Sequence, residues 1–226
     1  MKYENVCEGI FVSRSNRFVA TVIINGNEEV CHVKNTGRLR ELLTTGAKVF
    51  VTECDKPGRK TRYDLIAVYK GDVLYNIDSQ MPNAVFSEYL GSGALFDDIT
   101  KIKPESTYGD SRFDFYVEHG GKKAFIEVKG VTLERGNVML FPDAPSSRGI
   151  KHLNCLSGCF SEGYEAYVVF VVGAHTGEVF MPNEEAVPQF AAALRAAKAS
   201  GVHIIAKKCI VHPGEVTLAE DIAIKL

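Results

Sequence analysis

Residues 112–130 read RFDFYVEHGGKKAFIEVKG, and this stretch decides the fold of the second half of the chain. Apolar residues alternate with polar ones on both sides of Gly120-Gly121, which is the pattern of two antiparallel strands joined by a two-residue turn. Glycine suits both turn positions because each requires a positive φ. If His119 pairs with Lys122 across this turn, the register of the whole hairpin follows.

One face of the predicted hairpin is apolar, and the other is charged. The apolar face carries three opposed pairs, namely Phe113 with Val128, Phe115 with Ile126 and Val117 with Ala124. On the other face Asp114 lies opposite Glu127, and Lys129 points the same way two residues further on. Like charges at opposed positions destabilise a strand pair by about 0.2–1 kcal/mol. Tyr116 facing Phe125 on that side indicates partial burial, which increases the cost.

A divalent cation would relieve the repulsion between Asp114 and Glu127. Mg²⁺ usually binds one or two carboxylates together with waters and substrate phosphates. Lys129 beside them can orient a water molecule or stabilise the charge on an attacked phosphodiester. The trio therefore predicts metal-assisted phosphodiester hydrolysis with Mg²⁺ or Mn²⁺. The alternative is that Glu127 and Lys129 are exposed strand charges and that Asp114 pairs with Arg112 or another base.

Two further acids are candidates to complete the metal shell. Glu88 lies on a short helix predicted over 84–90, for which Asn83 is the expected N-cap. Glu105 follows a strand predicted over 99–103. For each of them, an ordinary surface position is an equal alternative.

A helix predicted over 146–160 follows the hairpin. Arg148 and His152 are four residues apart and share a face of this helix. They form either a basic pair that holds a phosphate or two solvated residues on an exposed stripe. The residues predicted on the core side are Ile150, Leu153, Leu156 and Phe160.

The first 80 residues predict short strands separated by turns, with one helical turn over 37–46. Asn25-Gly26 is a strong hairpin signal. Five or six strands in this length are typical of a small closed barrel of the OB type, and an SH3-like barrel has almost the same pattern. The remainder alternates strands and helices, which predicts a mixed-sheet α/β fold. We therefore expect two domains, residues 1–82 and 83–226.

The charge of the chain is nearly balanced but unevenly distributed. The 226 residues hold 26 Lys and Arg against 28 Asp and Glu, which excludes a protein coated with basic residues. Segment 56–63, KPGRKTRY, has four basic residues and no acid. We expect the first domain to contact a polyanion, DNA or another nucleic acid, unless this segment is simply a solvated basic loop. The candidate contacts are Arg14, Arg17, Lys34, Arg38, Arg59, Lys60 and Arg62.

No segment reaches the roughly 18 to 20 apolar residues that a membrane-spanning helix needs, and the N-terminal residues lack the apolar core of a signal peptide. The six cysteines contain no C-x-x-C pair. We therefore expect a cytoplasmic protein with reduced thiols and no membrane contact. A helix predicted over 184–201 either covers the sheet or supports a homodimer.

Six segments in order carry a resemblance over nearly the whole chain. They are HVKNTGRLREL (32–42), KTRYDLIAVYKG (60–71), PNAVFSEYL (82–90), PESTYGDSRFDF (104–115), FIEVKGVTLERGNVMLFPDAPSSRGIKHL (125–153) and EAYVVFVV (165–172). Together they resemble the sugar fermentation stimulation protein A family. The resemblance implies an N-terminal OB-fold domain, a domain similar to the PD-(D/E)XK nucleases, DNA binding, and a role in regulating sugar (maltose) metabolism.

The nuclease pattern implied by the resemblance falls on Asp114, Glu127 and Lys129, and Glu88 matches the extra acid that many such nucleases carry. Phe113 stands where these nucleases often have a proline. Two other functions remain open, because a fold does not establish an activity. One is a DNA-binding regulator that keeps the nuclease scaffold without cleaving. The other is a protein-interaction module, which leaves Asp114 opposite Glu127 unexplained.

Overall fold

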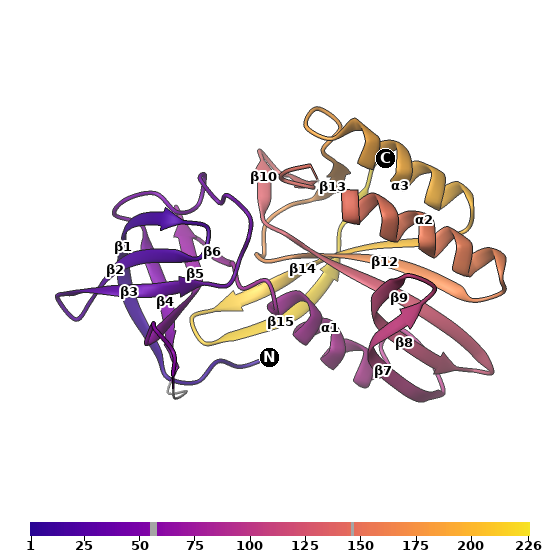
Figure 1. The fold of residues 1–226 in the computed structure, drawn as a ribbon, viewed down its shortest axis with the longest axis horizontal. Helices are drawn as coiled ribbons and strands as arrows, with labels where there is room; N and C mark the ends of the chain where they lie inside the picture. The colour runs from indigo at the N-terminus through magenta and orange to yellow at the C-terminus, as the bar shows by residue number, and fades with distance from the viewer. Residues whose placement is uncertain (55–57, 146) are drawn as a thin grey trace.

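A computed structural model describes residues 1–54, 58–145 and 147–226, and Figure 1 shows a β-barrel beside a larger α/β part. The strands β3-β2-β1-β4-β5-β6 are hydrogen-bonded in this order, and β3 also pairs with β5. The strands β1 to β5 therefore close into a five-stranded barrel, as expected. The barrel part comprises β1 (Val6–Asn16), β2 (Val19–Ile24), β3 (Asn27–Val33), β4 (Lys48–Glu53), β5 (Tyr63–Lys70) and β6 (Val73–Asn76).

The helical turn predicted over 37–46 is wrong, because these residues form turns. The backbone N–H groups of Leu42 and Leu43 both donate to the carbonyl of Leu39, which has a φ of 50°. All three leucines are buried in the same apolar cluster as the barrel strands. Burial of these side chains therefore determines the path of the loop, and continuous helical hydrogen bonding does not.

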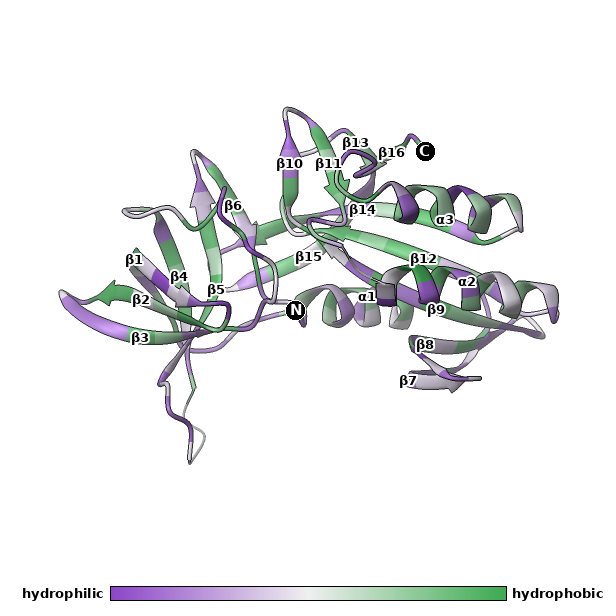
Figure 2. Cartoon of the chain, turned by 45° about the horizontal axis from the view of Figure 1, so that its top comes forward, coloured by the Kyte–Doolittle hydropathy of each residue, from purple (hydrophilic) through white to green (hydrophobic). Residues whose placement is uncertain are grey.

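The second part is built on a mixed six-stranded sheet, which confirms the predicted α/β fold. Its strand order is β15-β14-β12-β9-β8-β7, with β12 parallel to both β9 and β14. The sheet comprises β7 (Ile99–Tyr108), β8 (Ser111–His119), β9 (Lys122–Val131), β12 (Glu165–Val172), β14 (His203–His212) and β15 (Glu215–Asp221). Much of β12 is coloured at the apolar end of the scale in Figure 2, and all of its residues after Glu165 are buried, as is typical of a central parallel strand.

A smaller sheet of four short strands, in the order β10-β11-β13-β16, extends the second part. The sequence pattern does not predict these strands, because each has only two to four residues. They are β10 (Leu133–Arg135), β11 (Val138–Phe141), β13 (Val179–Pro182) and β16 (Ala223–Ile224). The antiparallel strand β15 is also absent from the sequence-based prediction.

Three helices cover the large sheet: α1 (Met81–Gly91), α2 (Ser147–Ser161) and α3 (Pro188–Ala199). Helix α1 packs on one face, where Val85 and Phe86 join an apolar cluster with Phe115 and Ile126. Helix α2 packs on the opposite face and lies against α3 (Figure 1). None of the helices in the described part of the chain is long and apolar enough to cross a membrane.

The predicted hairpin register is confirmed from His119–Lys122 to Phe115–Ile126, where the ladder of paired residues ends. Beyond this point the strands part. Phe113 lies on the α2 face, with its ring 5.9 Å from that of His152, whereas Val128 belongs to the cluster on the α1 face. The predicted pairing of Phe113 with Val128 is therefore wrong, because the alternation of faces is interrupted between Phe113 and Phe115.

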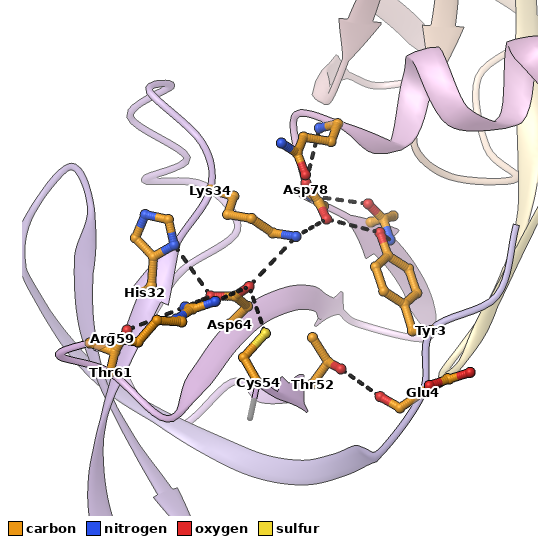
Figure 3. A network of polar contacts seen from close by, with 12 residues as sticks. Tyr3, Glu4, His32, Lys34, Thr52, Cys54, Arg59, Thr61, Asp64 and Asp78 are labelled. Carbon is orange, nitrogen blue, oxygen red and sulfur yellow. Dashed lines mark hydrogen bonds and ion pairs between the residues drawn. The ribbon is translucent and has the colours of Figure 1, made fainter. Parts of the chain in front are cut away.

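A network of polar contacts forms around the buried carboxylate of Asp64 in β5 (Figure 3). Both terminal nitrogens of the Arg59 guanidinium donate to this carboxylate. The Sγ of Cys54 donates to it at 3.3 Å, His32 Nδ1 lies 3.3 Å away, and the Lys34 ammonium lies 3.7 Å away. Asp64 thus holds together side chains from three strands or loops of the barrel.

Lys34 joins this network to the start of α1. Its ammonium lies 2.7 Å from the buried Asp78 carboxylate, which also accepts a hydrogen bond from the Tyr3 hydroxyl (Figure 3). Asp78 in turn accepts from the backbone N–H of Gln80 through its side chain and from that of Met81 through its carbonyl. The barrel therefore fixes where α1 begins.

We predict that Asp64→Asn lowers the free energy of unfolding by about 2 kcal/mol at pH 7, because it leaves Arg59 without a charged partner and removes one of the two carboxylates that Lys34 contacts. Burial raises the pKa of Asp64, but Arg59, Cys54 and Lys34 outweigh it, so the pKa lies below 3.8. The stabilisation is therefore present above the unfolded pKa and is lost as pH falls through the folded pKa.

Urea denaturation of wild type and variant between about pH 3 and 8 measures this difference, which should narrow below about pH 4. The exposed acid Asp72, in the β5–β6 turn, provides the control variant Asp72→Asn, for which little change is expected. Equal stability of wild type and Asp64→Asn at pH 7 would contradict the assigned role.

Candidate active site

Asp114 occupies the point where β8 and β9 part. Its Oδ2 accepts a hydrogen bond from the backbone N–H of Val128 at 2.7 Å, and its Oδ1 accepts one from the Asn83 side-chain amide of α1 at 2.8 Å. The carboxylate thus fills the opening between the strands and is anchored on both oxygens. The predicted alternative, an ion pair between Asp114 and Arg112, is not what holds it.

Glu127 is buried, with only 4% of its surface exposed. Its Oε1 accepts a hydrogen bond from Lys129 Nζ and lies 2.5 Å from His152 Nδ1 in α2. Its Oε2 is buried without a hydrogen-bond partner among the described residues. An unpartnered buried carboxylate oxygen is costly, so this atom calls for a cation or donor that the protein itself does not supply.

The two carboxylates do not share one face of the sheet as predicted. Asp114 reaches toward α1, whereas Glu127 reaches His152 on the α2 side. The negative charge of Glu127 nevertheless contributes to raising the pKa of Asp114.

The pKa values of the two acids are displaced in opposite directions. Burial, followed by the negative charge of Glu127, raises the pKa of Asp114 despite its two hydrogen bonds. Burial also acts to raise the pKa of Glu127, but the hydrogen bond to His152 and the charge of Lys129 outweigh it, so that pKa is lowered. Glu127 is thus compensated within the protein, and Asp114 is not.

These residues fit a magnesium-type cation. No group of three or more His, Cys, Asp or Glu side chains that would form a complete metal site lies within the described part of the chain. Mg²⁺ needs only one or two carboxylates when waters and substrate phosphates fill its other positions. The orphaned Oε2 of Glu127 and the uncompensated charge of Asp114 match that requirement.

Glu88 and Glu105, the other predicted metal ligands, are placed elsewhere. The Glu88 carboxylate lies 2.7 Å from the N-terminal ammonium of Met1 and is largely exposed. Glu105 has a φ of 50°, and its exposed carboxylate lies 3.5 Å from Arg112. The structure therefore brings neither acid into contact with Asp114.

Asn83 contributes to the site by donating to Asp114, a role that the sequence pattern does not predict. The pattern predicts it as a helix cap, but α1 begins at Met81, with Pro82 in the first turn and Gln80 at the N-cap. Asn83 therefore lies inside the helix, where its amide is free to hold the Asp114 carboxylate. A proline in the first helical turn is the signal that would have located this helix start correctly.

His152 lies on the buried stripe of α2, where only 4% of its surface is exposed. The sequence analysis places it beside Arg148, and Arg148 Nε does donate to His152 Nε2, at 3.5 Å. Phe160, predicted toward the core, is exposed, and Cys159 takes its place. The stripe is therefore rotated by one residue position, and His152 faces Glu127 instead of solvent.

Arg14, a predicted nucleic-acid contact, is occupied within the barrel. Its guanidinium donates to the backbone carbonyls of Asn35, Gly37 and Arg38 at 2.7–2.9 Å. This places its charge against the loop that follows β3. Its contacts are those of a side chain that shapes the loop.

Three other predicted basic contacts also lie on acids of the barrel. Arg59 and Lys34 contact Asp64, and Arg62 Nε donates to Glu53 at 2.6 Å. The remaining three, Arg17, Arg38 and Lys60, are exposed and form no ion pair with the described residues. Among the seven predicted contacts in the barrel, these three carry the positive charge that the described residues leave unpaired. Lys56 and Pro57 of the basic segment lie outside the described residues.

A pocket of about 370 Å³ separates the barrel from the second part, and Arg17 and Arg38 line it together with Pro82 and Gly130. Gly130 directly follows Lys129 in β9. A Cβ at Gly130 would lie 2.8 Å from Pro82 Cγ, so the close contact between α1 and β9 requires glycine. The pocket therefore adjoins the backbone that carries the candidate site.

Family models match both parts of the chain. The SfsA N-terminal OB domain matches residues 12–77, and the sugar fermentation stimulation protein RE domain matches residues 80–215. The chain belongs to the sugar fermentation stimulation protein family. The resemblance inferred from the sequence segments is thus confirmed, as are the OB-type barrel and the restriction endonuclease-like domain.

Individual members of the family agree over the full length. The chain is 50% identical to a sugar fermentation stimulation protein homolog of Clostridium beijerinckii, with all of both chains covered. It is 52% identical to a homolog of Desulfitobacterium hafniense, covering 100% of this chain and 99% of the relative. A solved structure of Pyrococcus furiosus SfsA in complex with Ca²⁺ superposes with a TM-score of 0.92 at 29% identity, covering 100% of this chain and 98% of that one.

We predict that Asp114→Asn raises the melting temperature of the metal-free protein by about 2–4 °C, because removing one of two interacting buried charges returns on the order of 1 kcal/mol. Asparagine keeps the shape of the side chain; its oxygen can accept from the Val128 N–H, and the Asn83 amide can turn so that its own oxygen accepts from the new NH₂ group. Differential scanning calorimetry in a chelating buffer at pH 7 measures the change. A lower melting temperature for the variant would show that the carboxylate charge stabilises the metal-free fold.

Proposed function

We propose that this chain is a metal-dependent nuclease that acts on DNA. The observation that carries the proposal is the Glu127 carboxylate, with one oxygen held by Lys129 and His152 and the other buried without a partner among the described residues. The Ca²⁺ complex of Pyrococcus furiosus SfsA supports a cation site within the family. Mg²⁺ or Mn²⁺ is the ion we propose for this chain.

In this proposal Asp114 and Glu127 hold the cation, and Asn83 keeps Asp114 in place. A bound divalent cation would supply Lewis-acid stabilisation of the phosphate oxygens. The Lys129 ammonium, fixed by Glu127, lies where it stabilises negative charge that develops on the phosphate. The burial of the site strengthens each of these electrostatic contacts.

The proposed DNA path runs along the boundary between two domains, residues 1–82 and 83–226. Arg17 and Arg38 line the pocket beside Gly130, so a strand that enters there would reach the candidate site with its phosphates neutralised. Lys60 offers a third unpaired charge on the barrel. Membership in the family supports a link between this DNA contact and the regulation of sugar metabolism.

We predict that Lys129→Ala reduces plasmid nicking in Mg²⁺ or Mn²⁺ by at least about 100-fold, because it removes the positive group at the reacting phosphate. Gel analysis of supercoiled plasmid with time measures the rate. Lys123, an exposed lysine on the same strand, provides the control Lys123→Ala, which should nick at the wild-type rate. Wild-type protein that never nicks plasmid, RNA or single-stranded DNA with either ion would refute the nuclease proposal.

One observation favours a second candidate, a DNA-binding regulator that does not cleave. Both oxygens of Asp114 and one oxygen of Glu127 already accept hydrogen bonds within the protein. A site held in this way is stable without substrate chemistry. Retardation of DNA without any nicking would favour this regulator, and failure to bind nucleic acid at all would leave the protein-interaction module.

For both the nuclease and the non-cleaving regulator, we predict that the double variant Arg17→Ala/Arg38→Ala binds DNA with a weaker salt dependence. The magnitude of the negative slope of log affinity against log salt should fall by about 2, because each lost phosphate contact removes about one released counterion. Fluorescence anisotropy with a labelled oligonucleotide, between about 50 and 200 mM salt, measures the slope. Arg195, a half-buried arginine of α3 that donates to Glu184, gives the control Arg195→Ala. An unchanged slope in the double variant would place the DNA elsewhere.

A further inference from the structure

His152 is a buried histidine that the proposed chemistry leaves without a role. Its Nδ1 lies 2.5 Å from Glu127 Oε1, and its ring meets the Phe113 ring edge-on at 5.9 Å. On the other side of the ring, Arg148 Nε donates to Nε2 at 3.5 Å. Contacts on both nitrogens and on the ring edge therefore hold the imidazole in one orientation.

We infer that His152 is a positioning residue that holds Glu127 through Oε1 and thereby keeps Oε2 directed at the cation site. This inference rests on the proposed function, because it names what orients one of the two carboxylates in that site. In this role His152 donates a hydrogen bond to Glu127, the proposed metal ligand, and does not itself contact the cation or the substrate.

The hydrogen-bond pattern determines which ring nitrogen donates. Because Nε2 accepts from the Arg148 guanidinium, the ring hydrogen resides on Nδ1. Nδ1–H then donates to Glu127 Oε1, which also receives the Lys129 ammonium. With two donors on Oε1, rotation of the carboxylate about its bond to the chain would break both contacts. Oε2 is therefore left as the free, buried acceptor.

Lys129 alone would not fix Glu127 in this way. Its four-carbon side chain is flexible and its ammonium can follow the carboxylate through several rotamers. The His152 ring, in contrast, is packed within α2 and against Phe113. Partners of this kind behind a metal ligand typically account for 10- to 100-fold in metal affinity. The expected effect of losing the Nδ1 donor is of that size.

The burial of His152 excludes the phosphate-binding role that the sequence analysis offers for it. With 4% of its surface exposed and both nitrogens engaged, the ring has no donor left for a strand of DNA. The remaining alternative is that His152 only packs in the core. His119 provides a matched control for this alternative, because it is also buried, lies within hydrogen-bond distance of Glu165 at 3.0 Å and stacks on Phe96.

The test is calorimetric titration of the full chain with MnCl₂, in wild type and in the variants His152→Asn, His152→Gln and His119→Gln. An asparagine amide nitrogen occupies about the position of Nδ1, whereas that of glutamine occupies about the position of Nε2. We expect His152→Gln to weaken Mn²⁺ binding about 10- to 100-fold. We expect His152→Asn to stay within about threefold of wild type, and His119→Gln to bind as wild type does.

Both substitutions at position 152 keep a polar side chain of moderate size, so any general loss of stability should affect both variants alike. A difference in Mn²⁺ affinity between them therefore reports the position of the hydrogen-bond donor. Equal Mn²⁺ affinity in wild type and His152→Gln would overturn the positioning role alone, as would an equal loss in the asparagine and glutamine variants. Absence of Mn²⁺ binding by wild type would overturn the proposed metal site and this inference together.

Discussion

The structure depends on one hydrogen bond in which a side chain replaces a backbone acceptor. Where the hairpin ladder stops, the backbone N–H of Val128 donates to the Asp114 carboxylate. A side chain in this position holds two strands apart without leaving a buried donor unpaired. Where the strands open, the Asn83 amide of α1 reaches Asp114, and the buried Glu127 carboxylate reaches His152 on the α2 side. Helices on both faces of the sheet therefore contribute to the candidate site.

Within that opening, the protein places positive or hydrogen-bonding groups against the charge of Glu127 but leaves the charge of Asp114 without a cationic partner. Glu127 has an ammonium and an imidazole on the same oxygen, and its pKa is lowered in spite of burial. Asp114 has only neutral amide donors, and its pKa is raised by burial and by Glu127. An arrangement built for stability alone would distribute the cationic groups between the two acids. The asymmetry is what a proposed cation would correct, since it would contact the uncompensated side.

The sequence predicts the hairpin and its register well, because Gly120-Gly121 fixes the turn and alternation fixes the rest. It does not predict where the ladder ends, since a carboxylate that replaces a backbone acceptor leaves no pattern in the alternation. Nor does it place Asn83 or His152. Asn83 depends on the exact first residue of α1, and His152 on a rotation of α2 by one position, and both are decided by tertiary packing.

Four of the nine residues predicted to bind nucleic acid contact acids or backbone carbonyls of the barrel, namely Arg14, Lys34, Arg59 and Arg62. Arg14 shapes the loop after β3, while Arg59 and Lys34 neutralise buried acids. Basic groups paired with acids in this way contribute little to a long-range positive field. Of the predicted contacts, the exposed Arg17 and Arg38 line the pocket between the two parts. In the proposed function, a polyanion would meet these two arginines beside Gly130, the residue that follows Lys129.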